Sequence, residues 1–510
     1  MKNRSSTRIF FKTPIVIHPL LLSIYPILFL FTHNIGEMSP NQMVLPMAVS
    51  IGFAIVLWVA LGCILGNIRK AGMATTLFLF FFFAYGHLYE LLTSWGVFVP
   101  KHAYLLPSAL LICGYCIYFI SLLKSNFHMI TTILNVIALL LIIINLANIT
   151  IYQITKPKLV PAQAANRVNP SLVGLESLPD IYYIVLDEYS HLDTMREYYN
   201  FDNSRFIKSL EEKGFFVAHR SKTRSPHTPQ IIAQVLNMEF LTGGWNWDKK
   251  KKKYIEIKSG EHDFASEPSS DLTFRKLAYS KSLDFLMAKG YRYIAFGNSF
   301  TKDRYDRYME DNADQYFNYF STADGSWISE FQAALWNTSM LKPFYYHMVG
   351  GQYEIASRRQ TLHTLEHIKK MVSVAGPKFV FAHIFCPHAD YVFGSQGEYI
   401  AHQNWGNYKD KQYYRGQYIF ITREIEKTVD VLLKKSKNPP VIILQSDHGQ
   451  RPNHHPDLLI GIDEWRKILN ALYLPGVDRT ELNESISPVN TFRLIFNRYF
   501  GAAYRLLEDD

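Results

Sequence analysis

The chain is poor in cysteine, with only four among its 510 residues. Cys63, Cys113 and Cys116 lie in long apolar runs, and Cys386 stands alone in the remainder, so we expect no disulfide framework. The sequence also lacks internal repeats and the glycine-rich motifs that bind phosphates of nucleotides. Nucleotide binding therefore has no support.

Acidic residues are scarce in the first 155 residues, which hold only Glu37 and Glu90 against eight lysines and arginines. This part carries a net charge of +6 out of the chain's +9, which leaves only +3 for the rest. Basic residues spread along an apolar third are typical of membrane topology, whereas a nucleic-acid binder concentrates them on a folded surface. The contents of 48% hydrophobic and 15% aromatic residues exclude a disordered chain.

Long apolar runs fill this first part. A hydrocarbon core about 30 Å thick needs roughly 20 apolar residues in a helix. Five stretches meet this requirement and predict five transmembrane helices, at about 14–32, 44–66, 72–94, 103–123 and 128–152. His87 and Glu90, about one turn apart in the third, suit a polar pathway, a lipid headgroup site or simple snorkelling near a helix end.

The basic residues between the spans predict their orientation. Seven lie before span one, between spans two and three, or between spans four and five, and the opposite loops hold only Lys101. We expect a cytoplasmic N-terminus and, after an odd number of spans, everything beyond residue 152 on the outer side of the membrane. Residues 153–179 contain four prolines and are predicted to be a linker, so the domains are 1–152 and 180–510.

The second domain alternates strand and helix patterns. Uninterrupted apolar runs predict strands at 181–186, 215–218, 291–296, 379–385 and 441–444. Helical patterns occupy 203–213, 272–289, 360–374 and 416–435. Apolar strands that alternate with helices favour a mostly parallel sheet covered on both faces, an α/β/α sandwich. Ligands of such sheets bind at the carboxyl ends of the strands.

Three of these strand ends carry polar groups that packing does not explain. The first ends in Asp187 and Glu188, the fourth runs into residues 386–390 (CPHAD), and the last into residues 446–449 (SDHG). An Asp-His pair at the end of a buried strand offers a carboxylate and an imidazole to one cation. Three such ends in one parallel sheet predict a metal site.

Together these segments resemble the sulfatase-like members of the alkaline phosphatase superfamily. The resemblance rests on residues 180–187 (DIYYIVLD), 379–388 (FVFAHIFCPH) and 441–449 (VIILQSDHG), and it covers roughly residues 180–500. Five spans before an external domain resemble the layout of the lipoteichoic acid synthase and phosphoethanolamine transferase branch. The resemblance implies a membrane enzyme that acts on lipid-linked or cell-envelope substrates, such as a membrane lipid or a lipid-linked glycan.

The resemblance also implies a site. One divalent metal, Mn²⁺ or Zn²⁺ with Mg²⁺ or Ca²⁺ as alternatives, would be held by Asp187, Asp447, His448 and a hydroxyl nucleophile at the start of a helix. Residues 221–229 (SKTRSPHTP) precede such a helix, and Thr228, followed by a proline that suits a first turn, is our preferred nucleophile. Ser225 and Thr223 compete with it, and an N-cap threonine without a chemical role is the alternative.

Histidines complete the expected site. His388 would bind the phosphoryl group or protonate the leaving group, and His454 and His455 would bind phosphate or a second metal; each is equally compatible with an ordinary loop residue.

Sulfatases proper make a formylglycine from a Cys/Ser-x-Pro-x-Arg sequence, which does not occur here. This absence favours phosphoryl transfer or hydrolysis through a covalent phospho-enzyme. The alternatives are a sulfatase-like hydrolase without formylglycine, or a degenerate member that binds envelope glycan or a partner protein. Glu188 departs from the pattern, because related membrane members often have glycine there.

Overall fold

The structure, a computed structural model, describes residues 14–35, 40–94, 101–124, 127–155, 178–241, 245–248, 253–256, 270–297, 304–319, 330–345, 351–401, 410–451 and 460–508. The chain forms two compact units. The membrane unit comprises Met1–Lys158 and Trp327–Gly350, and the α/β unit comprises Leu159–Ser326 and Gly351–Asp510. The division into residues 1–152, 153–179 and 180–510 stays a prediction.

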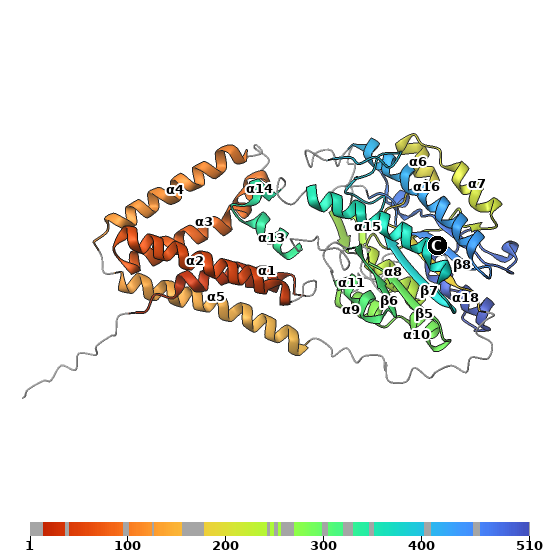
Figure 1. The fold of residues 1–510 in the computed structure, drawn as a ribbon, viewed down its shortest axis with the longest axis horizontal. Coiled ribbons are helices and arrows are strands. Elements are labelled where there is room, and N and C mark those ends of the chain that lie inside the picture. Colours follow the sequence, from red (N-terminus) through yellow and green to blue (C-terminus); the bar gives the residue numbers. More distant parts are fainter. Residues whose placement is uncertain are drawn as a thin grey trace, which may run out of the picture. The chain divides into compact units, whose positions relative to one another are not determined.

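The membrane unit is built from apolar helices (Figure 1). They are α1 (His18–His33), α2 (Val44–Leu65), α3 (Ile68–Ser94), α4 (His102–Leu122) and α5 (His128–Thr155), and the short η1 (Pro40–Met43) precedes α2. In the described part of the chain, four of them are long and apolar enough to cross a membrane. The fifth, α1, has 16 residues and is shorter. Four spans are therefore confirmed, and the predicted count of five is approximate.

Burial separates the inner and outer surfaces of these helices. Large apolar side chains on α2, α4 and α5, such as Val56, Leu111 and Ile154, are exposed, as expected of helices surrounded by lipid. On α3, Ala71 and Ala74 are fully buried, and a Cβ atom on Gly72 would lie 2.6 Å from a methyl group of Val16. Small residues thus let α3 pack closely in the centre of the unit.

A segment distant in sequence completes the membrane unit. Trp327–Gly350 contains α13 (Glu330–Thr338) and α14 (Lys342–Tyr345), and it packs against α1 and α3. The Met340 amide donates a hydrogen bond to the Phe82 carbonyl over 2.8 Å. Gly86 allows the approach, because a Cβ atom there would lie 2.1 Å from the Asn337 carbonyl oxygen.

The α/β unit is organised around a seven-stranded sheet of order β2-β9-β8-β1-β7-β5-β6. Its strands are β1 (Ile181–Leu186), β2 (Phe216–Val217), β5 (Arg292–Phe296), β6 (Gln315–Phe317), β7 (Lys378–Ile384), β8 (Val441–Ser446) and β9 (Asn470–Tyr473). Strands β6, β5, β7, β1 and β8 are parallel, while β9 runs antiparallel to both β8 and β2. A separate hairpin joins β3 (Trp245–Asp248) and β4 (Lys253–Glu256).

Helices cover both faces of the sheet (Figure 1). Successive side chains of β1 point to opposite faces, so Tyr182 and Ile184 enter one hydrophobic core and Tyr183 and Val185 the other. The first core includes α6 (Leu192–Tyr199), α7 (Ser204–Glu212), α15 (Gly351–Lys370) and α16 (Lys411–Lys435). The second includes α8 (Thr228–Asn237), α9 (Ser270–Ala278), α10 (Lys281–Ala288), α11 (Arg304–Asn312) and α18 (Thr491–Phe500). The remaining short helices of the unit are η5 (Met371–Ser373), α17 (Ile462–Arg466), η8 (Arg479–Glu481) and η9 (Pro488–Asn490).

The predicted fold class is confirmed: apolar helices precede an α/β domain with a mostly parallel sheet and helices on both faces. All five predicted strands are present within two residues of their expected bounds. The helix expected at 272–289 is divided: α9 ends at Ala278, and α10 begins at Lys281 with Ser280 as its N-cap. Strands β3, β4, β6 and β9 were not predicted; they are short and lack a clear apolar run.

Candidate metal centre

The sheet register brings three polar strand ends to one edge. Strand β1 lies between β7 and β8, and its last residue, Leu186, pairs with Ile384 on one side and Ser446 on the other. All three strands are parallel, so the residues that follow them emerge at the same edge. Asp187 therefore lies beside Asp447 and the segment that carries His388.

Asp187, Asp447 and His448 form a compact ligand cluster. One ligand atom from each lies within 4.8 Å of the others, and all three side chains are buried. Among the described residues this is the one group of three or more acidic, histidine or cysteine side chains that close together. The structure thus brings together three of the four metal ligands that the sequence resemblance implies.

The fourth expected ligand, Thr228, reaches the same cluster. Helix α8 begins at Thr228 with Pro229 in its first turn, and the Thr228 hydroxyl donates a hydrogen bond to Asp447 Oδ2 over 2.5 Å. Ser225 is turned elsewhere, since its hydroxyl donates to Gln230 Oε1 over 2.6 Å. Thr223 is buried beside Arg466, whose backbone carbonyl accepts a hydrogen bond from the Thr223 amide. Of the three candidate hydroxyls, only that of Thr228 contacts the cluster in the described structure.

The electrostatics of the cluster suit a cation. Burial raises the pKa of Asp447, and the neighbouring Asp187 carboxylate raises it further. Burial also acts to raise the pKa of Asp187, but His388, His383 and His448 together lower it to about 2. Two buried carboxylates repel each other when both are ionised, and a divalent cation between them removes that cost.

An unsatisfied acceptor supports the same conclusion. Asp187 Oδ1 is buried and accepts no hydrogen bond within the described structure. Asp447 Oδ1, by contrast, accepts hydrogen bonds from the backbone amides of Glu188, over 3.1 Å, and His448, over 2.7 Å. A buried carboxylate oxygen without a partner is costly, and a metal ion would satisfy it. Two carboxylates, an imidazole and a hydroxyl are a donor set that fits Zn²⁺ or Mn²⁺.

His388 lies next to this cluster. Its backbone amide donates to the Asp187 carbonyl over 3.1 Å, and its ring lies against that of Phe385. Burial acts to lower the pKa of His388, but the negative charges of Glu188 and Asp187 outweigh it, so the pKa is raised. A histidine that keeps its proton near neutral pH can donate it or bind an anion.

The structure adds residues that sequence reasoning missed. His383, buried within β7, places Nε2 3.1 Å from Asp187 Oδ2. The sequence indicates it only as a polar residue within an apolar strand, one residue before the end of β7. His227 is the N-cap of α8, and burial, followed by the charges of Arg451 and His448, lowers its pKa to about 4.

Glu188 also differs from expectation. It adopts a left-handed conformation with φ of 58°, which glycine adopts more readily than any other residue. Its buried carboxylate lies 3.3 Å from Arg451 Nε, and Arg451 in turn approaches His448 Nε2 to 3.3 Å. Arg451 thereby brings a positive charge to the edge of the cluster. His454 and His455 lie outside the described residues.

Comparison with known proteins finds similar solved structures but no similar sequence. No protein family matches the chain, and no curated protein does. The C-terminal periplasmic domain of EcEptC from Escherichia coli, in its complex with zinc, is similar at 11% identity and a TM-score of 0.41, covering 63% of this chain and 82% of that one. The lipoteichoic acid synthase LtaP from Listeria monocytogenes is similar at 10% identity and a TM-score of 0.35, covering 62% and 71%.

A third similar structure is a protein of the alkaline phosphatase superfamily from Vibrio parahaemolyticus, at 9% identity and a TM-score of 0.35, covering 62% of this chain and 65% of that one. The kind of protein that the sequence motifs resemble is thus also found among the similar solved structures.

Proposed function

We propose that the chain is a membrane-anchored, metal-dependent enzyme that transfers or hydrolyses a phosphoryl-type group on lipid-linked or cell-envelope substrates, with Thr228 as nucleophile. The observation that carries the proposal is the hydrogen bond from Thr228, at the start of a helix, to a carboxylate of a buried Asp-Asp-His cluster. A hydroxyl, a proton acceptor and a cation site in contact are the parts that nucleophilic attack on phosphorus requires.

Asp187, Asp447, His448 and Thr228 would hold one divalent cation, Zn²⁺ or Mn²⁺. When bound, such a cation lowers the pKa of a coordinated hydroxyl and polarises a phosphoryl oxygen.

The residues themselves supply the remaining chemistry. Asp447 Oδ2 accepts the hydrogen bond of the Thr228 hydroxyl and is thus positioned to take its proton as the Thr228 oxygen attacks phosphorus. The positive end of the α8 helix dipole, at Thr228, favours an anionic phosphoryl group. His388, whose pKa is raised, would donate a proton to the departing alcohol oxygen. Water or an acceptor alcohol then displaces the phosphoryl group from Thr228.

Two further arguments concern the type of ester and the location. A threonine cannot be converted to formylglycine in the way a cysteine or serine can, and the Cys/Ser-x-Pro-x-Arg sequence is absent. Phosphate esters are therefore favoured over sulfate esters as substrates.

The basic residues between the spans favour a cytoplasmic N-terminus. The α/β unit, which on this proposal is the catalytic unit, would then lie on the outer side of the membrane, where envelope substrates are found.

The proposal is tested with purified full-length protein, Mn²⁺ or Zn²⁺, and a phosphodiester or phospholipid donor. Thr228→Ala should abolish release of product, Thr228→Ser should retain part of it, and Ser225→Ala, as the matched control, should remain active. Full activity of Thr228→Ala would remove Thr228 from the mechanism.

Parallel assays separate the alternatives. Sulfate esters measured beside phosphate esters identify a sulfatase-like hydrolase if only the sulfate esters are cleaved. A preparation without stoichiometric metal, whose ligand binding is unchanged by Asp447→Ala, would indicate a non-catalytic binding protein.

A further inference from the structure

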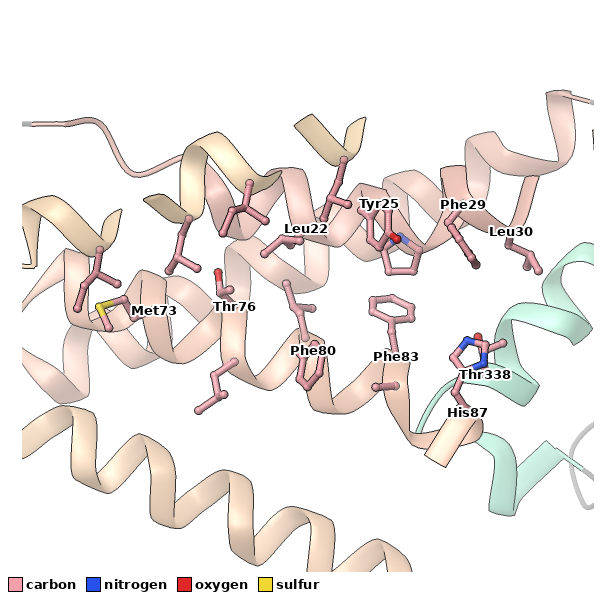
Figure 2. A pocket seen from close by; sticks show the side chains of 18 of the residues that line it. Leu22, Tyr25, Phe29, Leu30, Met73, Thr76, Phe80, Phe83, His87 and Thr338 are labelled. Atoms are coloured by element: carbon pink, nitrogen blue, oxygen red, sulfur yellow. The ribbon is translucent and has the colours of Figure 1, made fainter. Parts of the chain in front are cut away.

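A long apolar groove runs along the membrane unit. It has a volume of about 870 Å³, within the range of small-molecule sites. Leucine, isoleucine, phenylalanine and methionine side chains of α1, α3 and α5 form most of its walls, and Thr338 of α13 lies at its edge. Figure 2 shows Tyr25 and Phe29 of α1 facing Phe80 and Phe83 of α3 across the groove.

The dimensions of the groove suit a hydrocarbon chain. On α3 it extends from Met73 to His87, which at about 1.5 Å per residue is roughly 21 Å. This is about two thirds of a hydrocarbon core about 30 Å thick. On α5 the lining runs from Ile130 to Leu141 in the same way. An elongated apolar groove in helices that are surrounded by lipid accommodates one extended acyl chain.

The two ends of the groove differ in polarity. Near one end, the hydroxyl of Thr76 is already bonded to His18 Nδ1 over 2.6 Å. At the other end, Figure 2 shows His87 beside Thr338. One turn beyond His87, Glu90 Oε1 lies 2.6 Å from Lys342 Nζ of the inserted segment.

The second end thus offers hydroxyl, imidazole, carboxylate and ammonium groups. A molecule that matches this distribution has an apolar chain and a polar, charged head, as a phospholipid has.

We propose that this groove binds one acyl chain of a membrane phospholipid, with the headgroup at the α13 end beside His87 and Thr338. The further assignment of this lipid as the substrate rests on the proposed function. The segment that closes the headgroup end belongs in sequence to the region between β6 and α15 of the catalytic unit. Because Thr338 of this segment lines the groove, a lipid in the groove would contact it.

The binding site is tested in the unaltered protein first. The full-length chain is placed in vesicles of phosphatidylcholine and phosphatidylglycerol that contain a trace of phosphatidylglycerol with a diazirine in one acyl chain. After illumination, labelled peptides are mapped by mass spectrometry. We expect labels concentrated on residues 73–87 and 130–141. Equal labelling of these residues and of exposed positions such as Leu111 on α4 would overturn the proposal.

Filling the groove provides the second test. Ala84 on α3 and Leu134 on α5 both line it, so Ala84→Trp and Leu134→Trp each occupy it from a different wall. Ala60→Trp, at an exposed position of α2, is the matched control. We expect groove labelling to fall roughly tenfold in either groove variant. A tenfold loss of lipid affinity corresponds to about 1.4 kcal/mol. Displacing about two methylene groups of the acyl chain, at about 0.8 kcal/mol each, is enough to cause it. Unchanged labelling in a folded groove variant would overturn the proposal.

Activity separates this inference from the proposed function. We expect the groove variants to cleave a diacyl phospholipid more slowly than the wild type but a water-soluble ester of the same headgroup at the same rate. Equal rates on both substrates would overturn the assignment of the groove to the substrate lipid. If the wild type cleaves neither ester while the groove is still labelled selectively, the proposed function fails and the lipid site stands.

Discussion

Metal binding should stabilise the catalytic unit through Asp187, and removing this carboxylate should remove most of that effect. A ligand present at 100 times its dissociation constant stabilises the folded state by about 2.7 kcal/mol. For a unit of this size that corresponds to a rise in melting temperature of about 5 °C, at about 2 °C per kcal/mol. The wild type should therefore melt about 5 °C higher with Zn²⁺ or Mn²⁺ than with a chelator.

Asp187→Asn replaces one of three clustered protein ligands and leaves the others in place. A hundredfold loss of affinity at the same metal concentration reduces the stabilisation to about 0.4 kcal/mol, and the melting shift to about 1 °C or less. In the metal-free protein the same variant relieves the repulsion that raises the pKa of Asp447. It also alters the buried contact with His383 Nε2 at 3.1 Å, so the quantity to compare is each protein's melting temperature with metal and with chelator.

The assay is thermal unfolding followed by tryptophan fluorescence. Trp465 is buried in the catalytic unit, and its carbonyl accepts a hydrogen bond from the Gly449 amide next to His448. Asp193→Asn is the matched control, because Asp193 lies on α6 with its side chain 57% exposed. A full metal-induced shift in Asp187→Asn, equal to that of the control, would refute the assignment of Asp187 as a ligand.

Three further predictions concern His383, His388 and Gly86. His383→Gln should weaken metal binding by about 10- to 100-fold, measured by competition with a chelating dye, because His383 orients Asp187 from 3.1 Å; unchanged affinity would show that the contact has no such role. The pKa of His388 is raised and its protonated form is the expected donor, so activity should be lost as the pH rises through that pKa. A pH–rate profile measures this loss at high pH, and His388→Gln should no longer show it. The same loss in the profile of His388→Gln would contradict the assignment. Gly86→Val should lower the melting temperature of the membrane unit, measured by calorimetry, because a Cβ atom at this position would lie 2.1 Å from the Asn337 carbonyl oxygen. Gly52→Val, whose Cβ atom would meet open space, is the control and should leave the melting temperature unchanged.

The catalytic sheet was predictable because its central strands are buried on both faces. Strand β1 matches its predicted bounds, and its six residues are all fully buried, so no polar residue interrupts the apolar pattern. Polar residues at the ends of such strands must then lie at one edge of a parallel sheet. That single geometric rule places Asp187 beside Asp447 and His448 without knowledge of the tertiary structure.

The partners of these residues were not predictable in the same way. The contact between Glu188 and Arg451 joins residues far apart in the sequence, and neither belongs to a periodic pattern. The left-handed conformation of Glu188 could not be predicted from the sequence, because such a conformation is usually indicated by a glycine and this residue is a glutamate. His383 lies inside a strand, where a single histidine is compatible with an ordinary core position.

The inserted segment shows a different limit of sequence reasoning. Residues 327–350 stand between two elements of the catalytic unit, so their position in the sequence predicts that they belong to it. Their short helices carry no run long enough to indicate a membrane span. Their place in the membrane unit depends on complementary features of α3, namely the absent side chain of Gly86, the Phe82 carbonyl and the charge of Glu90. Each of these features is unremarkable alone.

The same features bring a later part of the sequence into the membrane unit. The chain passes between the two units after residue 158 and again where it enters and leaves the inserted segment. Phe331 is fully buried against Ile27 and Phe31 of α1, so a fragment that begins at residue 180 would expose this apolar surface to water. Such a fragment lacks the surface of α1 that covers Phe331. A lipid in the groove would contact the same inserted segment at Thr338.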